Sequence, residues 1–353
     1  MMRVQNMRQS TKRIEVGLSC LALLWMGCED PSPQPVTTFP SPILEEDSTE
    51  HFDALIVASP NDPALYVDRA AWHLRRGRIS EGLLDLNLAI EADSTYAPAW
   101  SAKADALYLT QAFEPCIDHL DVCLEVAPDH IPCLLRRAEM HIHLQQYPEA
   151  FERLNDVLRI DVLNSDAYWM KGIIYKTQGN LDIARSSFQT AVEVKPSFYD
   201  GYIALGLACA ESNDTLAIGY YQTAMDLKPR SVEARYDLAY FLQEFKPTKP
   251  SYLRRALALY ESISDIDTSN ATAAFNRGYI HLEYLQNYDS AVKHFSAAID
   301  ALPYYHQALF NRGLAHESLG QASLAEADYR AALSFKPDYT PAALALERVL
   351  GDR

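Results

Sequence analysis

The chain has 353 residues, of which 48% are hydrophobic and 22% are charged. This composition excludes a largely disordered protein, and the length exceeds one ordinary core, so two domains or one extended array are expected. The formal charge of −16 provides no general attraction for phosphate backbones, which argues against a nucleic-acid partner. Six cysteines are too few for a disulfide scaffold, and 13 glycines favour helices over turn-rich β structure.

The N-terminal segment has the features of a secretory signal. Four basic residues precede an uncharged stretch over 16–27, which is too short to span a bilayer as a mature helix. The closing residues Gly27-Cys28, a small residue directly before a cysteine, resemble the lipobox of bacterial lipoproteins, with Trp25 and Met26 as departures from its usual pattern. The resemblance implies a signal peptide over 1–27, lipidation of Cys28, and a place in the bacterial cell envelope. An ordinary cleaved signal and an uncleaved anchor are the alternatives.

Residues 28–47 are rich in proline, serine and threonine and cannot form a helix or a central strand. We expect an extended tether that holds a folded domain away from the membrane. Because the chain is acidic, anionic lipid head groups would repel that domain. The outer membrane is the expected site of anchoring.

The rest of the chain repeats with a period near 34 residues. Two further columns of small residues follow the first after about 12 and about 19 residues, and prolines close many units. Apolar residues recur at helical spacing in both halves of a unit, separated by turns such as Gln178-Gly179-Asn180, so each unit is predicted to form two packed helices. The first column consists of Ala70, Ala104, Ala138, Gly172, Gly206, Ala239, Gly278 and Gly313.

This pattern resembles the tetratricopeptide repeat family over about residues 63–339. The resemblance implies an all-α fold, a right-handed superhelical solenoid of about eight helix pairs. A half-repeat over 48–62 and a helix over 340–353 are expected to cap the two ends, and the C-terminal helix is expected to cover Leu333 and Phe335. The repeats are expected at 63–96, 97–130, 131–164, 165–198, 199–231, 232–270, 271–305 and 306–339.

No catalytic signature is present, because the sequence has neither a phosphate-binding glycine loop nor a His-Glu-x-x-His or Gly-x-Ser-x-Gly motif. Four histidines share the eleventh repeat position, which places them about one repeat apart and predicts packing rather than a shared metal. These are His73, His141, His281 and His316. We therefore predict a non-enzyme without cofactor or metal. Cys123 and Cys133 either remain buried thiols or pair across neighbouring repeats.

In this family the first helices line a concave groove, and their second, fifth, sixth, ninth, twelfth and thirteenth positions face it. In repeats four to eight these positions hold many large apolar residues, which predicts a partner-binding groove. The resemblance implies that Asn276 and Asn311, at the sixth position, bond an extended peptide backbone. Packing of several large residues between helices is the alternative. The predicted groove residues are Trp169, Ile173, Tyr236, Tyr240, Phe275, Asn276, Tyr279, Phe310 and Asn311.

Two functions remain open at this point. The first is a membrane-anchored scaffold for protein–protein interaction that holds an unknown protein or peptide in its groove. The second is a carbohydrate- or peptidoglycan-binding envelope lipoprotein that uses Trp169, Tyr236 and Tyr240 as stacking platforms. Neither the partner nor the oligomeric state follows from the sequence.

Overall fold

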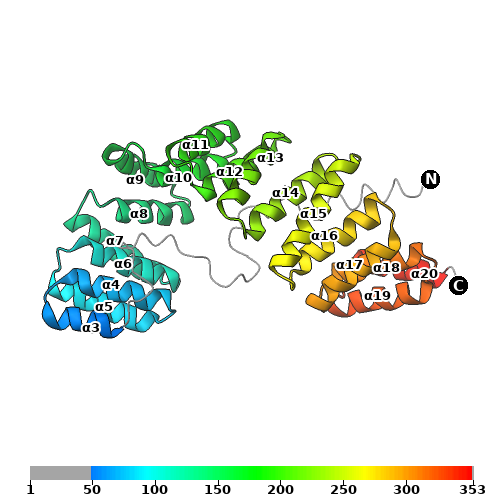
Figure 1. Cartoon of the computed structure of the whole chain (residues 1–353), viewed down its shortest axis with the longest axis horizontal. Coiled ribbons are helices and arrows are strands. Elements are labelled where there is room, and N and C mark those ends of the chain that lie inside the picture. The colour runs from blue at the N-terminus through cyan, green and yellow to red at the C-terminus, as the bar shows by residue number, and fades with distance from the viewer. Residues whose placement is uncertain (1–48, 352–353) are drawn as a thin grey trace. The chain divides into compact units, whose positions relative to one another are not determined.

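The computed structural model describes residues 49–351. The predicted signal peptide 1–27, Cys28 and the tether 28–47 lie outside this range. Within it, the chain is a succession of helices joined by short turns, without strands (Figure 1). This confirms the predicted all-α repeat fold. No helix in the described range combines the length and the apolar character needed to cross a membrane.

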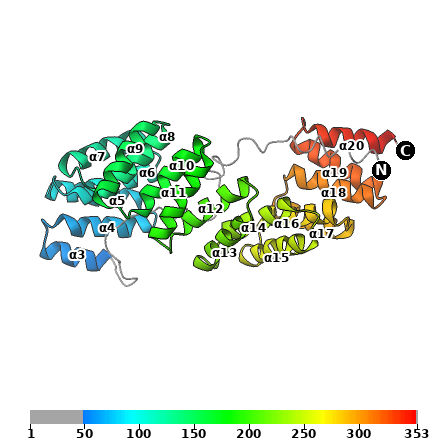
Figure 2. The ribbon, with the colours of Figure 1, turned by 90° about the horizontal axis from the view of Figure 1, so that it is seen from above.

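The chain divides into two compact units at residue 136, inside helix α8. In the first unit, α3 lies against α4, and the helices α4 to α7 pair in chain order (Figure 2). The helices up to and including α8 are α3 (Thr49–Ala58), α4 (Pro63–Arg75), α5 (Ile79–Ala92), α6 (Ala97–Leu109), α7 (Phe113–Val126) and α8 (Ile131–His143).

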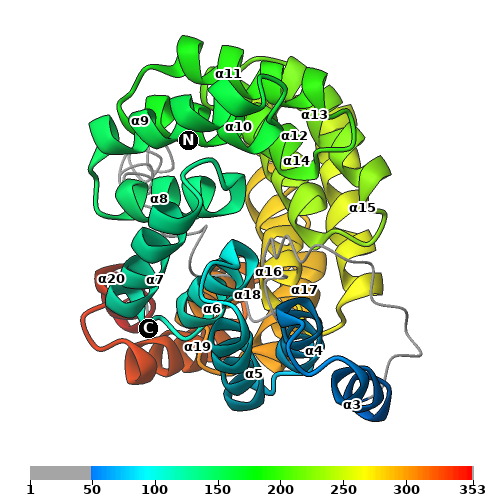
Figure 3. The ribbon, with the colours of Figure 1, turned by 90° about the vertical axis from the view of Figure 1, so that its left-hand side faces the viewer.

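In the second unit, each first helix packs against the second helix of its own repeat, as α10 and α11 do in Figure 3. Its helices are α9 (Tyr147–Ile160), α10 (Ser165–Thr177), α11 (Leu181–Val194), α12 (Tyr199–Glu211), α13 (Leu216–Leu227), α14 (Val232–Phe245), α15 (Pro250–Ile266), α16 (Ala271–Tyr279), η1 (Ile280–Tyr284), α17 (Tyr288–Ala301), α18 (His306–Ser318), α19 (Ala322–Phe335) and α20 (Thr340–Gly351).

The turn within a repeat uses one residue in the left-handed region. Gly179 occupies it in repeat four with a φ of 79°, a conformation that glycine adopts without steric strain. Asn213 and Gln286 occupy the corresponding places in repeats five and seven. Repeat six instead joins its helices through residues 246–249, and most of its additional length lies in α15, which has 17 residues where α11 has 14.

The two helices of a repeat pack through a match of side-chain size. A Cβ added at Gly172 would lie 2.4 Å from Cε1 of Phe188, so the aromatic ring fills the space that glycine leaves. Gly313 and Tyr329 form the same pair in repeat eight, where an added Cβ would lie 2.5 Å from Cε1 of the tyrosine ring. The aromatic ring in repeats four and eight therefore fills the volume that glycine leaves, as close packing requires.

Repeat seven contains one residue more than the usual period, and the structure shows where it is accommodated. The α-helix of its first half ends at Tyr279 and continues as a π-helical turn over Ile280–Tyr284. Such a turn absorbs one additional residue without interrupting the helix. It places Tyr284 beside Tyr279, with ring centroids 5.8 Å apart.

Helix α20 packs on α19 at the C-terminal end of the second unit, as Figure 2 shows. It buries Ala342, Ala345 and Val349 in a cluster that also contains Tyr329. The expectation that it covers Phe335 is wrong, because this residue ends α19 and remains 53% exposed.

Candidate functional site

The predicted groove residues of repeats six and seven lie together. The rings of Tyr236 and Tyr240 on α14 stack with centroids 6.3 Å apart, and those of Phe275 and Tyr279 on α16 stack at 6.4 Å. The Nδ2 of Asn276 donates a hydrogen bond of 3.4 Å to the hydroxyl of Tyr236, which links the two helices. We call these five residues the aromatic cluster. Tyr240 is its most accessible member, at 43% exposed.

The two asparagines at the sixth position have the same local arrangement. Nδ2 of Asn276 donates to the carbonyl of Thr272 at 3.0 Å, and Nδ2 of Asn311 donates to that of Gln307 at 2.7 Å. Each amide is thus oriented by the preceding turn of its own helix. Neither Oδ1 accepts a hydrogen bond from the described residues. Asn276 is buried, whereas Asn311 is only partly buried, so the oxygen of Asn311 is the more accessible acceptor.

The other predicted groove residues lie elsewhere and are more involved in packing. Trp169 and Ile173 lie against the hydrophobic cluster around Phe188, and the buried indole Nε1 of Trp169 has no hydrogen-bond partner among residues 49–351. Phe310 is 6% exposed and packs at 5.5 Å from the ring of Tyr339. Packing, the alternative that the sequence left open, therefore describes Phe310 better than it describes Tyr240.

Acidic residues share the face that carries the aromatic cluster. Asp200 on α12 and Asp237 on α14 accept no hydrogen bond and form no ion pair with other described residues. Burial raises the pKa of Asp237 to about 7, and the charge of Glu233 adds to this shift. Burial also raises the pKa of Asp200, with a further contribution from Asp166. We call Asp200, Glu233 and Asp237 the acidic row.

Two neighbours define the surroundings of the acidic row. The hydroxyl of Tyr199 donates to Oε2 of Glu233 at 2.9 Å. The ammonium group of Lys228 lies 3.8 Å from the ring centroid of Tyr199, and its charge opposes the rise in the pKa of Asp200. One edge of the row therefore already holds a lysine against an aromatic ring.

The acidic row was missed by the sequence analysis, although a signal existed. Asp166, Asp200 and Glu233 occupy the second position of three consecutive repeats, which the family pattern assigns to the groove. The lack of a hydrogen bond to Asp237 from the described residues could be learned only from the structure.

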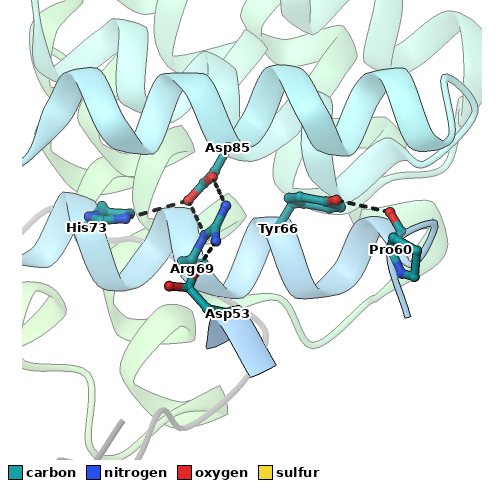
Figure 4. A network of polar contacts seen from close by, with 6 residues as sticks. All are labelled: Asp53, Pro60, Tyr66, Arg69, His73 and Asp85. Carbon is teal, nitrogen blue, oxygen red and sulfur yellow. Dashed lines mark hydrogen bonds and ion pairs between the residues drawn. The ribbon is translucent and has the colours of Figure 1, made fainter. Parts of the chain in front are cut away.

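A polar network joins the two helices of the first repeat (Figure 4). The guanidinium of Arg69 donates to both carboxylate oxygens of Asp85, at 2.9 and 2.6 Å, and also reaches Asp53. His73 approaches the same carboxylate, with Nε2 3.7 Å from Oδ2. A bidentate pair of this kind fixes helix orientation.

Repeat eight has the same three residue types at the same repeat positions. Arg312 donates to Asp328 at 2.9 and 2.7 Å, and Nε2 of His316 lies 3.9 Å from Oδ2 of that carboxylate. Arg312 also donates through Nη1 to Oγ of Ser296 at 3.0 Å, so that hydroxyl accepts from a guanidinium. Both networks link the first helix of a repeat to its second helix, so we assign them a structural role.

Cys123 and Cys133 form a disulfide between α7 and α8. The sequence had left pairing and free thiols open. Nδ1 of His130 lies 3.2 Å from the sulfur of Cys133, so three residues of two metal-binding types, cysteine and histidine, gather in one place. In this oxidised state the two sulfurs are bonded to each other. The bond constrains the chain between repeats two and three.

Comparison with known proteins agrees with this architecture. Residues 165–198 and 280–340 match models of the tetratricopeptide repeat. Tetratricopeptide repeat protein 6 of Homo sapiens is 26% identical over 207 residues, which cover 57% of this chain and 38% of that protein. Hsp70-Hsp90 organizing protein 2 of Arabidopsis thaliana is 29% identical over 84 residues, or 24% of this chain and 15% of the relative. The chain thus spans well under half the length of these relatives.

A solved structure shows the same fold over most of the chain. A chain of the APC/C hetero-tetramer Cut9–Hcn1 matches 85% of this chain, and the match covers 58% of that structure's chain. The TM-score is 0.51 and the sequence identity is 15%. At this identity the likeness concerns the arrangement of helix pairs.

Proposed function

We propose that this chain, a member of the tetratricopeptide repeat family, is a non-enzymatic scaffold that holds a segment of a partner protein against its first helices. The binding surface is the first-helix face, formed by the groove-facing positions of repeats four to eight. The observation that carries the proposal is the aromatic cluster, which combines the exposed ring of Tyr240 with the oriented amide of Asn276. Accessible aromatic residues beside fixed hydrogen-bonding groups are typical of protein-binding surfaces.

A peptide suits this surface better than a sugar. The hydroxyl of Tyr236 is bound by Asn276, and its ring is covered on one side by Tyr240. Trp169 packs edge-on against Phe198 at 6.3 Å, with its indole nitrogen buried. Two of the three predicted stacking platforms are therefore engaged within the protein. The Oδ1 atoms of the two asparagines, in contrast, accept no hydrogen bond from the described residues, and that of the partly buried Asn311 can accept one from a backbone amide.

The second part of the proposal is the location. We infer that lipid on Cys28 anchors the scaffold in the bacterial cell envelope, with the outer membrane as the expected membrane. The lipobox-like residues before Cys28 and the proline-rich stretch after it support this inference. The disulfide between Cys123 and Cys133 also supports it, because disulfides persist mainly in oxidising compartments outside the cytoplasm.

A photo-crosslinking amino acid placed at single positions tests the binding surface in living cells. Position 240, on the first-helix face, should yield a crosslinked product. Position 324 is the matched control, because Leu324 is 51% exposed on the second helix α19 and should yield none. Crosslinking from 324 but not from 240 would place the partner on the outer helices and contradict the proposal.

A separate experiment tests the anchor. Cys28→Ser should abolish incorporation of labelled palmitate and leave an unprocessed precursor, whereas Cys116→Ser should not affect either. Palmitate labelling that persists in Cys28→Ser would refute lipidation at this residue.

A further inference from the structure

The first-helix face carries a strong charge imbalance in repeats four to six. Figure 1 labels the three first helices of these repeats, α10, α12 and α14. The six groove-facing positions per repeat include a single basic residue, Lys176. That lysine is already paired with Glu211 at 2.8 Å. The acidic residues at these positions are Asp166, Asp200, Glu211, Glu233, Asp237 and Glu244.

The acidic row receives positive charge from the described chain only at longer range. Lys228 and Lys195 lower the pKa of Asp200, Lys228 also lowers that of Glu233, and Lys176 lowers that of Asp237. None of these lysines forms an ion pair or hydrogen bond with the row, and Glu233 accepts a hydrogen bond only from the uncharged hydroxyl of Tyr199. A partly buried carboxylate without a directly bonded cation is unfavourable, because more distant charges replace only part of the hydration that burial removes. A cation brought by another molecule would supply the missing interaction.

Aromatic rings complete the surroundings that a cation requires. Tyr236 and Tyr240 are on the same helix as Asp237, within one turn of it, and Tyr240 is accessible. A lysine or arginine that approaches the carboxylate can place its alkyl stem or guanidinium on these rings. Lys228 of this chain makes the equivalent contact with Tyr199 beside Glu233, which shows that the local geometry accepts a lysine.

From this arrangement we infer that the first-helix face selects a basic, extended segment of its partner, with lysine or arginine side chains between the acidic row and the tyrosines of α14. The inference rests on the proposed function and specifies the chemistry of the partner. An acidic segment or one that ends in a free carboxylate close to the row would be repelled by the same charges.

Binding of a defined probe to the full chain in detergent tests this inference. The probe is a fluorescein-labelled peptide of alternating lysine and alanine, and the matched peptide replaces lysine with glutamate. Fluorescence anisotropy should show binding of the lysine peptide alone, and its affinity should fall as salt is added. Asp237→Asn should weaken binding by roughly tenfold, because a hydrogen-bonded charge pair is lost.

Asp182→Asn is the matched control, since it makes the same charge change at an exposed position on the second helix α11. It should leave the affinity unchanged. Equal binding of the glutamate peptide, or equal weakening by Asp182→Asn and Asp237→Asn, would overturn the inference. Crosslinking from position 240 to an acidic partner would also overturn it and yet leave the scaffold function intact.

A second copy of the chain could supply the basic segment, for example from the loop that contains Lys246 and Lys249. Sedimentation velocity distinguishes this case. A dimer that Asp237→Asn dissociates would overturn the assignment to a separate partner. A monomer at the concentrations used for peptide binding supports it.

Discussion

Gly172→Ala tests the size match that holds the two helices of a repeat together. In an open helical position this substitution stabilises by up to about 1 kcal/mol, because alanine is the better helix former. At Gly172 the added Cβ would lie 2.4 Å from Phe188. The side-chain and backbone shifts that such overpacking requires destabilise the fold by about 1–3 kcal/mol. We therefore expect a net destabilisation of up to about 2 kcal/mol.

Gly219 provides the matched control, because an added Cβ there has no atom within 4 Å. Urea unfolding of the full chain, followed by circular dichroism, should show Gly219→Ala to be more stable than wild type. The double variant Gly172→Ala/Phe188→Leu should be about 1–2 kcal/mol more stable than the sum of the two single effects predicts, because leucine leaves room for the methyl group. If Gly172→Ala is as stabilising as Gly219→Ala, or if the two substitutions at the pair are additive, the size match is not the cause.

Three further predictions concern polar groups. Asp85→Ala should destabilise by about 3 kcal/mol in urea unfolding because it leaves Arg69 without its buried partner, whereas Asp53→Ala, at a 58% exposed carboxylate, should cost less than about 1 kcal/mol. Reduction should lower the thermal midpoint, by the equivalent of about 2–3 kcal/mol, in wild type but not in a variant with both Cys123 and Cys133 changed to alanine. The pKa of Asp237 is about 7 when folded against an ordinary 3.8, so its ionisation destabilises the fold increasingly as pH rises through this window. The free energy of unfolding of Asp237→Asn should therefore equal that of wild type near pH 4. At pH 8 it should be about 1–2 kcal/mol larger, a value that already includes a reduction for partial solvent screening.

Much of the fold was predictable because each helix pair repeats one physical solution. Small residues at fixed spacing must face a helix neighbour, so the recurrence of Gly172 and Gly206 with their aromatic partners predicts two packed helices per unit. The place of the additional residue in repeat seven was not predictable. A longer turn and a π-helical turn satisfy the same 35-residue spacing, and only the packing around Ile280 distinguishes them.

The site was predictable in part, for a reason that Phe275 and Phe310 illustrate. Both begin the same tetrapeptide at the same repeat position. Phe310 is nevertheless buried, because Tyr339 and the terminal helix α20 cover the last repeat. Phe275 is only partly buried and stacks on Tyr279. Position within a repeat sets the direction of a side chain, while its exposure depends on the neighbouring repeat.

The acidic row lacks the arginine partners that two other buried carboxylates of this chain have. Asp85 and Asp328 each receive a bidentate arginine from the facing helix of their repeat. Asp237 receives none, although burial raises its pKa and opposes ionisation. A role in folding alone would be served better by asparagine at this position. If the row exists for a basic partner, Asp237→Asn must raise the stability of the free chain and lower its affinity for the lysine peptide, and a purely structural carboxylate could not produce these opposite changes.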